Sequence, residues 1–168
     1  VWADQPPPPS APITAHPLEF AGEPHDAKRI RLAEDLADKG EAAALITLPD
    51  SVAWLFNIRG ADIPRNPIAH AFAVLRADGS AVLLTDPAKC DDVLDHLGPQ
   101  VQVRPESDLA DVLTDIGGPL RIDPQSTPQA VADILSEAGI EARHGADPCR
   151  LPKACKNAGE LEGMRDAQ

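Results

Sequence analysis

The chain has 168 residues and a net charge of −12, from 27 acidic and 15 basic side chains. This length fits one domain, and the acidity argues against a partner bound through its negative charge, whether nucleic acid or an anionic membrane. Aromatic residues make up only 3% of the chain, so leucine, valine, isoleucine and alanine must form most of the core.

The sequence lacks the signals of membrane insertion and of secretion. No apolar run approaches the roughly 20 residues that span a bilayer, and no basic stretch followed by an apolar one occurs at the N-terminus. The cysteines Cys90, Cys149 and Cys155 match no common zinc-binding spacing and are expected to be free thiols. We therefore expect a cytoplasmic location.

The first 24 residues carry seven of the eighteen prolines, including the run from Pro6 to Pro9. Proline fixes φ and lacks an amide donor, so this segment is expected to be a surface connector that adds little to the core. A helix is predicted over residues 24–40, with Asp26 as its cap and Gly40 at its end. Its expected apolar face consists of Ile30, Ala33, Leu36 and Ala37.

Strands and helices alternate along the next hundred residues. Two apolar runs joined by a turn at Asp78-Gly79 predict a hairpin. The alternation indicates a layered α/β domain, in which the hairpin makes the sheet mixed rather than purely parallel. Strands are predicted at 42–48, 69–85 (the hairpin), 101–105, 119–123 and 140–145, and helices at 86–98, 106–118, 127–139 and from 156 onward.

No pattern typical of a catalytic or metal site is found in the sequence. The five histidines are scattered, and neither a nucleophile elbow nor a phosphate-binding glycine loop is present. The cluster of Asp91, Asp92 and Asp95 lacks the further oxygen ligands that Ca²⁺ or Mg²⁺ would need. We therefore expect no catalytic residue, no metal ligand and no cofactor within this chain.

The most distinctive stretch is residues 51–67, SVAWLFNIRGADIPRNP, in which an apolar helical segment precedes a polar loop. Two interpretations of this stretch are open. In the first, Trp54 and Phe56 are ordinary core residues. The loop that follows is then a simple turn, and Asp62 pairs with Arg65 at the surface.

In the second interpretation, the aromatic residues anchor a loop that presents binding groups. Loops on rigid scaffolds commonly carry such groups, and the planar guanidinium of Arg59 suits a carboxylate or a carbonyl. Within the chain, the candidate partner of Arg59 is Asp62. The candidate binding groups are Asn57, Arg59, Asp62 and Asn66, and the structural anchors of the loop are Trp54, Phe56, Gly60 and Pro67.

Residues 50–75, DSVAWLFNIRGADIPRNPIAHAFAVL, resemble the signature of the second domain of the three-domain Xaa-Pro aminopeptidases, the aminopeptidase P family. Residues 1–36 are similar to the family's entry into that domain, and residues 147–168 are similar to its exit toward the catalytic domain. In the exit, Ala158-Gly159 replace a more usual Pro-Val, and Gln168 stands where a histidine is common. The resemblance implies a creatinase/prolidase N-terminal domain, with a mixed β-sheet flanked by helices.

The resemblance also implies how the chain is divided and what its parent does. Residues 1–24 would connect it to a preceding domain, 25–150 would form the α/β domain, and 151–168 would begin a catalytic pita-bread domain. The parent enzyme would remove the N-terminal residue from peptides with proline in second position. Its two divalent metal ions, Mn²⁺ or Zn²⁺, would be held outside this chain.

By the same resemblance, the chain is a non-catalytic accessory domain that packs on flanking domains and shapes the substrate cleft. The equivalent loop in relatives borders the cleft, of its own chain or of a homodimer partner, which would place Arg59 near the peptide. The alternative is a protein-interaction module of a relative without peptidase activity, which the acidity fits loosely. The metal ligands of the catalytic domain, two Asp, one His and two Glu, distinguish these alternatives by their presence or loss.

Overall fold

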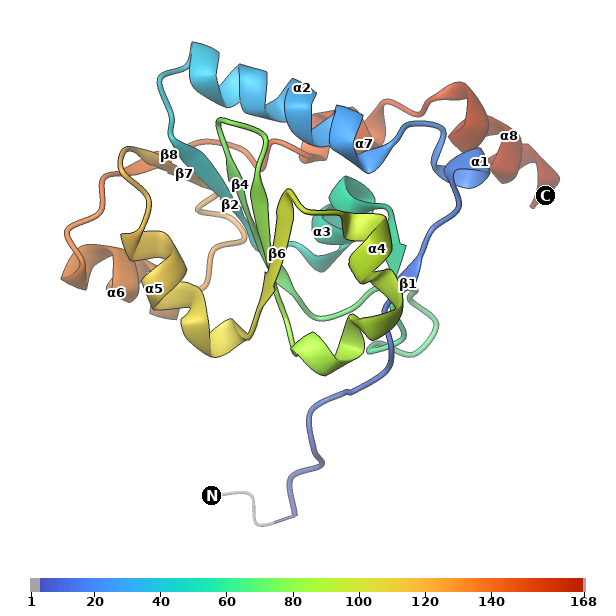
Figure 1. Ribbon diagram of the computed structural model, residues 1–168, viewed down its shortest axis with the longest axis horizontal. Coiled ribbons are helices and arrows are strands. Elements are labelled where there is room, and N and C mark those ends of the chain that lie inside the picture. Colours follow the sequence, from blue (N-terminus) through green and yellow to red (C-terminus); the bar gives the residue numbers. More distant parts are fainter. Residues whose placement is uncertain (1–3, 168) are drawn as a thin grey trace.

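The computed structural model describes residues 4–167, so the start of the expected connector and Gln168 lie outside the described residues. A six-stranded sheet forms the centre, with helices on both of its faces (Figure 1). Its strands lie in the order β6-β5-β4-β2-β7-β8, with bounds β2 Ala43–Ile46, β4 Phe72–Arg76, β5 Ala81–Leu84, β6 Val101–Arg104, β7 Leu120–Ile122 and β8 Ala142–His144. A separate pair consists of β1 Thr14–Ala15 and β3 Ile58–Arg59.

Helices fill most of the intervals between strands, as the alternating pattern predicts. Among residues 4–167, no helix is both long enough and apolar enough to cross a membrane. The α-helices are α1 Leu18–Ala21, α2 His25–Asp38, α3 Pro49–Phe56, α4 Leu94–Leu97, α5 Leu109–Thr114, α6 Gln129–Glu137, α7 Arg150–Ala154 and α8 Ala158–Asp166. Short 3-10 helices occur at η1 Pro87–Lys89, η2 Asp91–Val93 and η3 Glu106–Asp108.

The sheet combines parallel and antiparallel neighbours. β2 pairs antiparallel with β4 and parallel with β7, whereas β4 and β5 form the predicted hairpin. In the hairpin turn Gly79 has a φ of 83°, and Gly79 N donates a hydrogen bond to Arg76 O at 3.0 Å. The expected mixed α/β fold is confirmed.

Each face of the sheet carries its own apolar core, because successive side chains of a strand point to opposite faces. In β2, Ala44 and Ile46 join one core, while Ala43 and Leu45 join the other. Helices α2, α3 and α4 supply the first core, and α5 and α6 supply the second (Figure 1). The polar loop after α3 therefore lies on the face that α2 covers.

The predicted helix over residues 86–98 is wrong for most of its length. Residues there form η1 and η2, and only α4 at the end is α-helical. The Asp86 side chain accepts a hydrogen bond from Ala88 N at 3.0 Å and so stabilises a tight turn that begins at Pro87. This local turn competes with a continuous helix, and it leaves the Lys89 side chain buried.

The predicted helix over residues 24–40 is present as α2, but its expected apolar face is wrong in part. Ala33 and Leu36 are buried as expected, whereas Ile30 is 53% exposed and Ala37 is also exposed. The buried side of the helix instead begins with Lys28, which precedes Leu36 by eight residues. A basic residue thus occupies a core position that an apolar pattern does not indicate.

The start of α2 also differs from the prediction. Pro24 stands directly before the first helical residue, and Asp26 lies within the first turn rather than at the cap. The Asp26 carboxylate accepts a hydrogen bond from Ala27 N at 2.8 Å, and its charge still suits the positive end of the helix. Gly40 follows the helix with a φ of 65°, consistent with its expected place at the end.

The segment before residue 24 is exposed over residues 4–10, as expected of a connector. The expectation that it adds little to the core is wrong at Ile13, whose side chain is fully buried. Ile13 N donates to Lys89 O at 2.7 Å, and β1 follows directly. The segment is thus fixed to the domain from Ile13 onward, while the division of the chain at residue 24 remains a prediction.

Candidate functional site

Helix α3 ends at a residue with left-handed backbone geometry, which turns the chain into the loop of residues 57–67. Asn57 has a φ of 50° and a ψ of 53°, a conformation that asparagine adopts more readily than most residues. Ile58 and Arg59 then form β3, which pairs antiparallel with β1. The loop therefore begins against the N-terminal segment rather than in solvent.

The residues expected to anchor this loop lie at its two ends. Phe56 is fully buried and Trp54 is 9% exposed, so the end of α3 is held in the core. Gly60 lies so close to the returning chain that a Cβ atom there would come within 2.7 Å of Ala69 N. Gly60 N also donates to Pro67 O at 3.2 Å, which closes the loop.

Asp62 forms a buried ion pair with Lys89 and with neither arginine of the loop. The Asp62 side chain is 0% exposed and that of Lys89 is 4% exposed. The same carboxylate accepts a hydrogen bond from His70 N at 2.6 Å. The expected pairing of Asp62 with Arg59 and the alternative pairing with Arg65 are both wrong, because the turn of η1 brings a lysine inside the domain.

The four candidate binding groups therefore do not lie together. Asn66 lies at the exposed tip of the loop, where its backbone N donates to Ile63 O at 3.0 Å. Asp62 faces the interior. Only Asn57 and Arg59 line a common hollow, which has a volume of about 420 Å³.

This hollow, called here the α8 hollow, lies between α1, the end of α3, β3 and α8. Its volume falls in the range of pockets that hold small ligands or single side chains of a partner. Arg59 is half-buried at its wall, and its Nη1 donates to the neighbouring Ile58 O at 2.9 Å. The guanidinium therefore has further donors available toward the hollow.

Lys28 is the most deeply buried charge at the α8 hollow, with 1% exposure. Its Nζ donates to Asn57 Oδ1 at 2.7 Å and to Trp54 O at 3.1 Å. The ammonium also lies 4.3 Å from the centroid of the Trp54 ring. Uncharged oxygens at the negative end of α3 and the face of an indole thus take the place of a counter-ion.

Burial lowers the pKa of Lys28 from its ordinary 10.5 to about 8, although the charges of Glu160 and Glu23 oppose the shift. A lowered lysine pKa means that the unfolded chain binds more protons than the folded chain between these two values. The free energy of unfolding should therefore increase as the pH rises through this interval.

We expect the unfolding free energy of the chain, relative to that of a Lys28→Met variant, to increase by up to about 3 kcal/mol between pH 8 and pH 10.5. Urea denaturation of both proteins at several pH values measures this difference. Taking the difference cancels the other titrating groups, such as the Cys90 thiol, whose pKa burial raises to about 11. A Lys39→Met variant, at an exposed lysine, should show no such trend.

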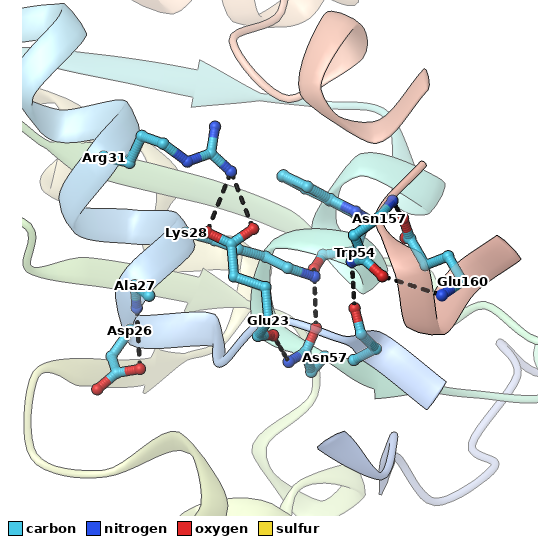
Figure 2. Close-up of polar contacts among 10 residues, drawn as sticks. Glu23, Asp26, Ala27, Lys28, Arg31, Trp54, Asn57, Asn157 and Glu160 are labelled. Carbon is cyan, nitrogen blue, oxygen red and sulfur yellow. Dashed lines mark hydrogen bonds and ion pairs between the residues drawn. The ribbon is translucent and has the colours of Figure 1, made fainter. Parts of the chain in front are cut away.

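Helix α8 is held against α1 by its capping residue, Asn157 (Figure 2). Asn157 Oδ1 accepts from Glu160 N at 2.9 Å, while Glu160 Oε2 accepts from Asn157 N at 3.0 Å. Asn157 Nδ2 donates to Ala21 O at 2.8 Å, which joins the two helices. Gly22 and Gly159 permit this approach, since a Cβ atom on Gly22 would lie 2.1 Å from Asn157 Oδ1.

Three residues of this site, Lys28, Asn157 and Glu160, were not predicted, although the sequence contains two signals for them. Lys28 precedes the buried Leu32 and Leu36 by four and eight residues, the spacing of one helix face. Asn157 and Glu160 have the Asn-x-x-Glu spacing of a capping box at the start of the predicted last helix. The first spacing indicates Lys28 and the second indicates Glu160, and both residues line the α8 hollow.

The described residues do not fit a divalent metal centre. Among residues 4–167 no group of three or more His, Cys, Asp or Glu side chains could hold a metal ion. At the α8 hollow, the positive charges of Lys28 and Arg59 would repel a cation.

A mixed sheet between two helical layers agrees with one known class of domain. Residues 4–160 match the family described as Creatinase/Prolidase N-terminal domain, and the chain belongs to this family.

Curated relatives indicate a narrower family within this class of domain. The chain is 32% identical over 176 residues to a protein named "Probable Xaa-Pro aminopeptidase P" from Talaromyces stipitatus, covering 99% of this chain and 27% of the relative. A protein of the same name from Coccidioides posadasii (strain RMSCC 757 / Silveira) is 34% identical over 176 residues, covering 98% of this chain and 29% of the relative. The chain thus spans less than a third of these curated relatives, and its resemblance to the aminopeptidase P family is confirmed.

Solved structures agree with this assignment. The chain superposes on the crystal structure of X-prolyl aminopeptidase from Caenorhabditis elegans, described as a cytosolic enzyme with a di-nuclear active site, with a TM-score of 0.83 and 26% identity. That match covers 98% of this chain and 28% of the enzyme. The N-terminal domain of the cytoplasmic peptidase PepQ from Mycobacterium tuberculosis H37Rv shares the fold, with a TM-score of 0.55, 23% identity, and coverage of 74% of this chain and 96% of that one.

Proposed function

We propose that the chain is a non-catalytic accessory domain of a metal-dependent Xaa-Pro aminopeptidase. Its similarity to proteins of that name extends over nearly all of the chain but less than a third of theirs, which supports a role beside a separate catalytic domain. In this proposal the parent holds two Mn²⁺ or Zn²⁺ ions in that domain. It releases the N-terminal residue from peptides with proline in second position.

The observation that carries this proposal is the position of the α8 hollow. The resemblance makes residues 151–168 the start of the catalytic domain, so Asn57 and Arg59 would lie at the boundary between the two domains. Exposed apolar side chains on α7 and α8, at Leu151, Leu161 and Met164, offer a surface for such packing, and Met164 also lines the hollow. The loop of residues 57–67 would then form part of the wall of the substrate cleft.

The wider setting follows from the same proposal. The parent would act in the cytoplasm on peptide substrates, in keeping with the cytosolic relative from Caenorhabditis elegans. Residues 1–24 would connect to a preceding domain, and the domain proper would extend over 25–150. The proposal also includes a homodimer of the parent. In that dimer, the loop of residues 57–67 would border the substrate cleft of the partner subunit.

We expect Arg59→Ala to lower kcat/KM of the full-length parent about tenfold or more, equivalent to roughly 1.4 kcal/mol of transition-state stabilisation. In the 168-residue chain the same change should alter the free energy of unfolding by less than about 1 kcal/mol. The reason is that the Arg59 side chain hydrogen-bonds only to the neighbouring Ile58 O among the described residues. Steady-state hydrolysis of Xaa-Pro peptides and urea denaturation measure the two effects.

The matched control is Arg65→Ala, since Arg65 is exposed at the tip of the same loop. If Arg59→Ala unfolds the chain while the folded parent keeps wild-type kinetics, Arg59 is structural and the cleft-wall role fails. If the parent has lost the metal ligands and hydrolyses no Xaa-Pro peptide, the accessory-domain proposal itself fails. The protein-interaction module would then be the remaining reading of the fold.

A further inference from the structure

The α8 hollow is a positively charged site in a strongly acidic chain. Three basic side chains line it, Lys28, Arg59 and Lys156, against one acidic side chain, Glu160. The chain as a whole carries a net charge of −12, so the sign of this hollow is opposite to that of the molecule. A local excess of positive charge attracts an anion to this place.

Two of these three basic side chains form no ion pair within residues 4–167, and the third forms only a long one. Lys28 and Arg59 form no ion pair with any described carboxylate, and their hydrogen bonds go to uncharged oxygens. Lys156 Nζ donates to Lys153 O at 2.7 Å and lies 3.9 Å from Glu160 Oε1, a long contact for an ion pair. Lys28 is buried without a carboxylate partner, and the half-buried Arg59 has donors left over, so both groups can still bind an anion.

A neutral donor at the same hollow is also unused. Trp54 lines the hollow, and its indole Nε1 is buried with no hydrogen-bond partner among the described residues. A buried donor without an acceptor costs free energy, which an arriving oxygen atom would recover. Indole and guanidinium donors together suit an oxyanion.

The charges of Arg59 and Lys28 also act on a neighbouring histidine. The pKa of His16, which also lines the hollow, is lowered first by burial and then by the charges of Arg59 and Lys28. His16 is therefore expected to be neutral near pH 7. The positive charge of the hollow therefore comes from its lysine and arginine side chains.

Much of the remaining lining is apolar and favours some classes of anion over others. Phe20, Ala21 and Met164 contribute uncharged surface around the basic groups. Such a lining suits a carboxylate that is carried on an aliphatic stem more than a bare inorganic ion. A polyanion is disfavoured, because the acidic surface outside the hollow would repel its other charges.

We propose that the α8 hollow binds the side-chain carboxylate of a glutamate or aspartate residue in a peptide, through Arg59, Lys28 and the indole N–H of Trp54. As a statement about substrates, this inference rests on the proposed function and makes acidic Xaa-Pro peptides the preferred class. As a statement about binding, it concerns the 168-residue chain alone. The two statements can be tested separately.

The binding test is a titration of the ¹⁵N-labelled chain with N-acetylglutamate α-amide, followed through the indole N–H signal of Trp54. A Trp2→Phe variant assigns that signal. The expected result is a saturable shift with the glutamate compound and none with N-acetylglutamine α-amide, which has the same shape without the charge. Arg59→Gln should weaken binding at least tenfold, equal to about 1.4 kcal/mol, while Arg65→Gln leaves it unchanged.

Several outcomes overturn the proposal. Equal shifts with the glutamine compound would remove the role of the charge, and unchanged binding in Arg59→Gln would remove the role of the hollow. Tighter binding of inorganic phosphate than of the glutamate compound would show that the ligand class is wrong. If the carboxylate does not bind while Arg59→Ala still lowers kcat/KM of the parent, the anion site fails and the accessory-domain proposal stands.

Discussion

Replacing Gly60 by alanine is expected to destabilise the chain by about 3 kcal/mol. The added Cβ atom would lie 2.7 Å from both the Cβ and the backbone N of Ala69, and 2.8 Å from its Cα. These atoms belong to a buried residue just before β4, so neither side can move without displacing the start of a central strand. Urea denaturation of the variant measures the loss.

The matched control is Gly117→Ala. A Cβ atom at Gly117 meets nothing within 4 Å, and its backbone is not in the left-handed region. This control should therefore change stability by less than about 1 kcal/mol, in either direction. Equal midpoints for the Gly60 and Gly117 variants would show that the loop can move away from Ala69, and that Gly60 does not fix its shape.

Most of the fold could be predicted because its signals are local. The hairpin follows from the Asp78-Gly79 turn between two apolar runs, and both of its strands lie where the pattern places them. The alternation of strands and helices likewise predicts a mixed α/β sheet. The prediction of a helix over residues 86–98 was wrong because two local signals compete there. The Asp86-Pro87 turn opposes the helical spacing of Val93 and Leu97.

The candidate site could be predicted less well, because its contacts join residues far apart in the chain. Lys28 reaches Asn57, 29 residues away, and no pattern within α2 reveals that its ammonium is accommodated by the end of α3. Lys89 and Asp62 are 27 residues apart. A sequence shows which groups need partners, but the choice between nearby and distant partners is made by the tertiary fold.

The Asp62–Lys89 pair joins three segments that the loop of residues 57–67 depends on. Asp62 also accepts from His70 N at 2.6 Å, just before β4, and Lys89 O accepts from Ile13 N at 2.7 Å in the N-terminal segment. Thr85 Oγ1 adds a hydrogen bond to His70 O at 2.9 Å. Loss of the pair should therefore affect the loop, the strand and the segment together.

We expect Lys89→Met to destabilise the chain by about 3–5 kcal/mol, because it leaves the fully buried Asp62 carboxylate without a counter-ion. The additional Asp62→Asn change should restore more than about 1 kcal/mol, since a neutral amide costs less to bury than an unpaired charge and can still accept from His70 N. Urea denaturation of the single and double variants measures this coupling. The control is Lys39→Met, because Lys39 forms an exposed ion pair with Asp35. This change should alter stability by less than about 1 kcal/mol. Additive effects of the two changes would mean that Asp62 and Lys89 are not coupled in solution. Their ion pair would then not account for the position of the loop.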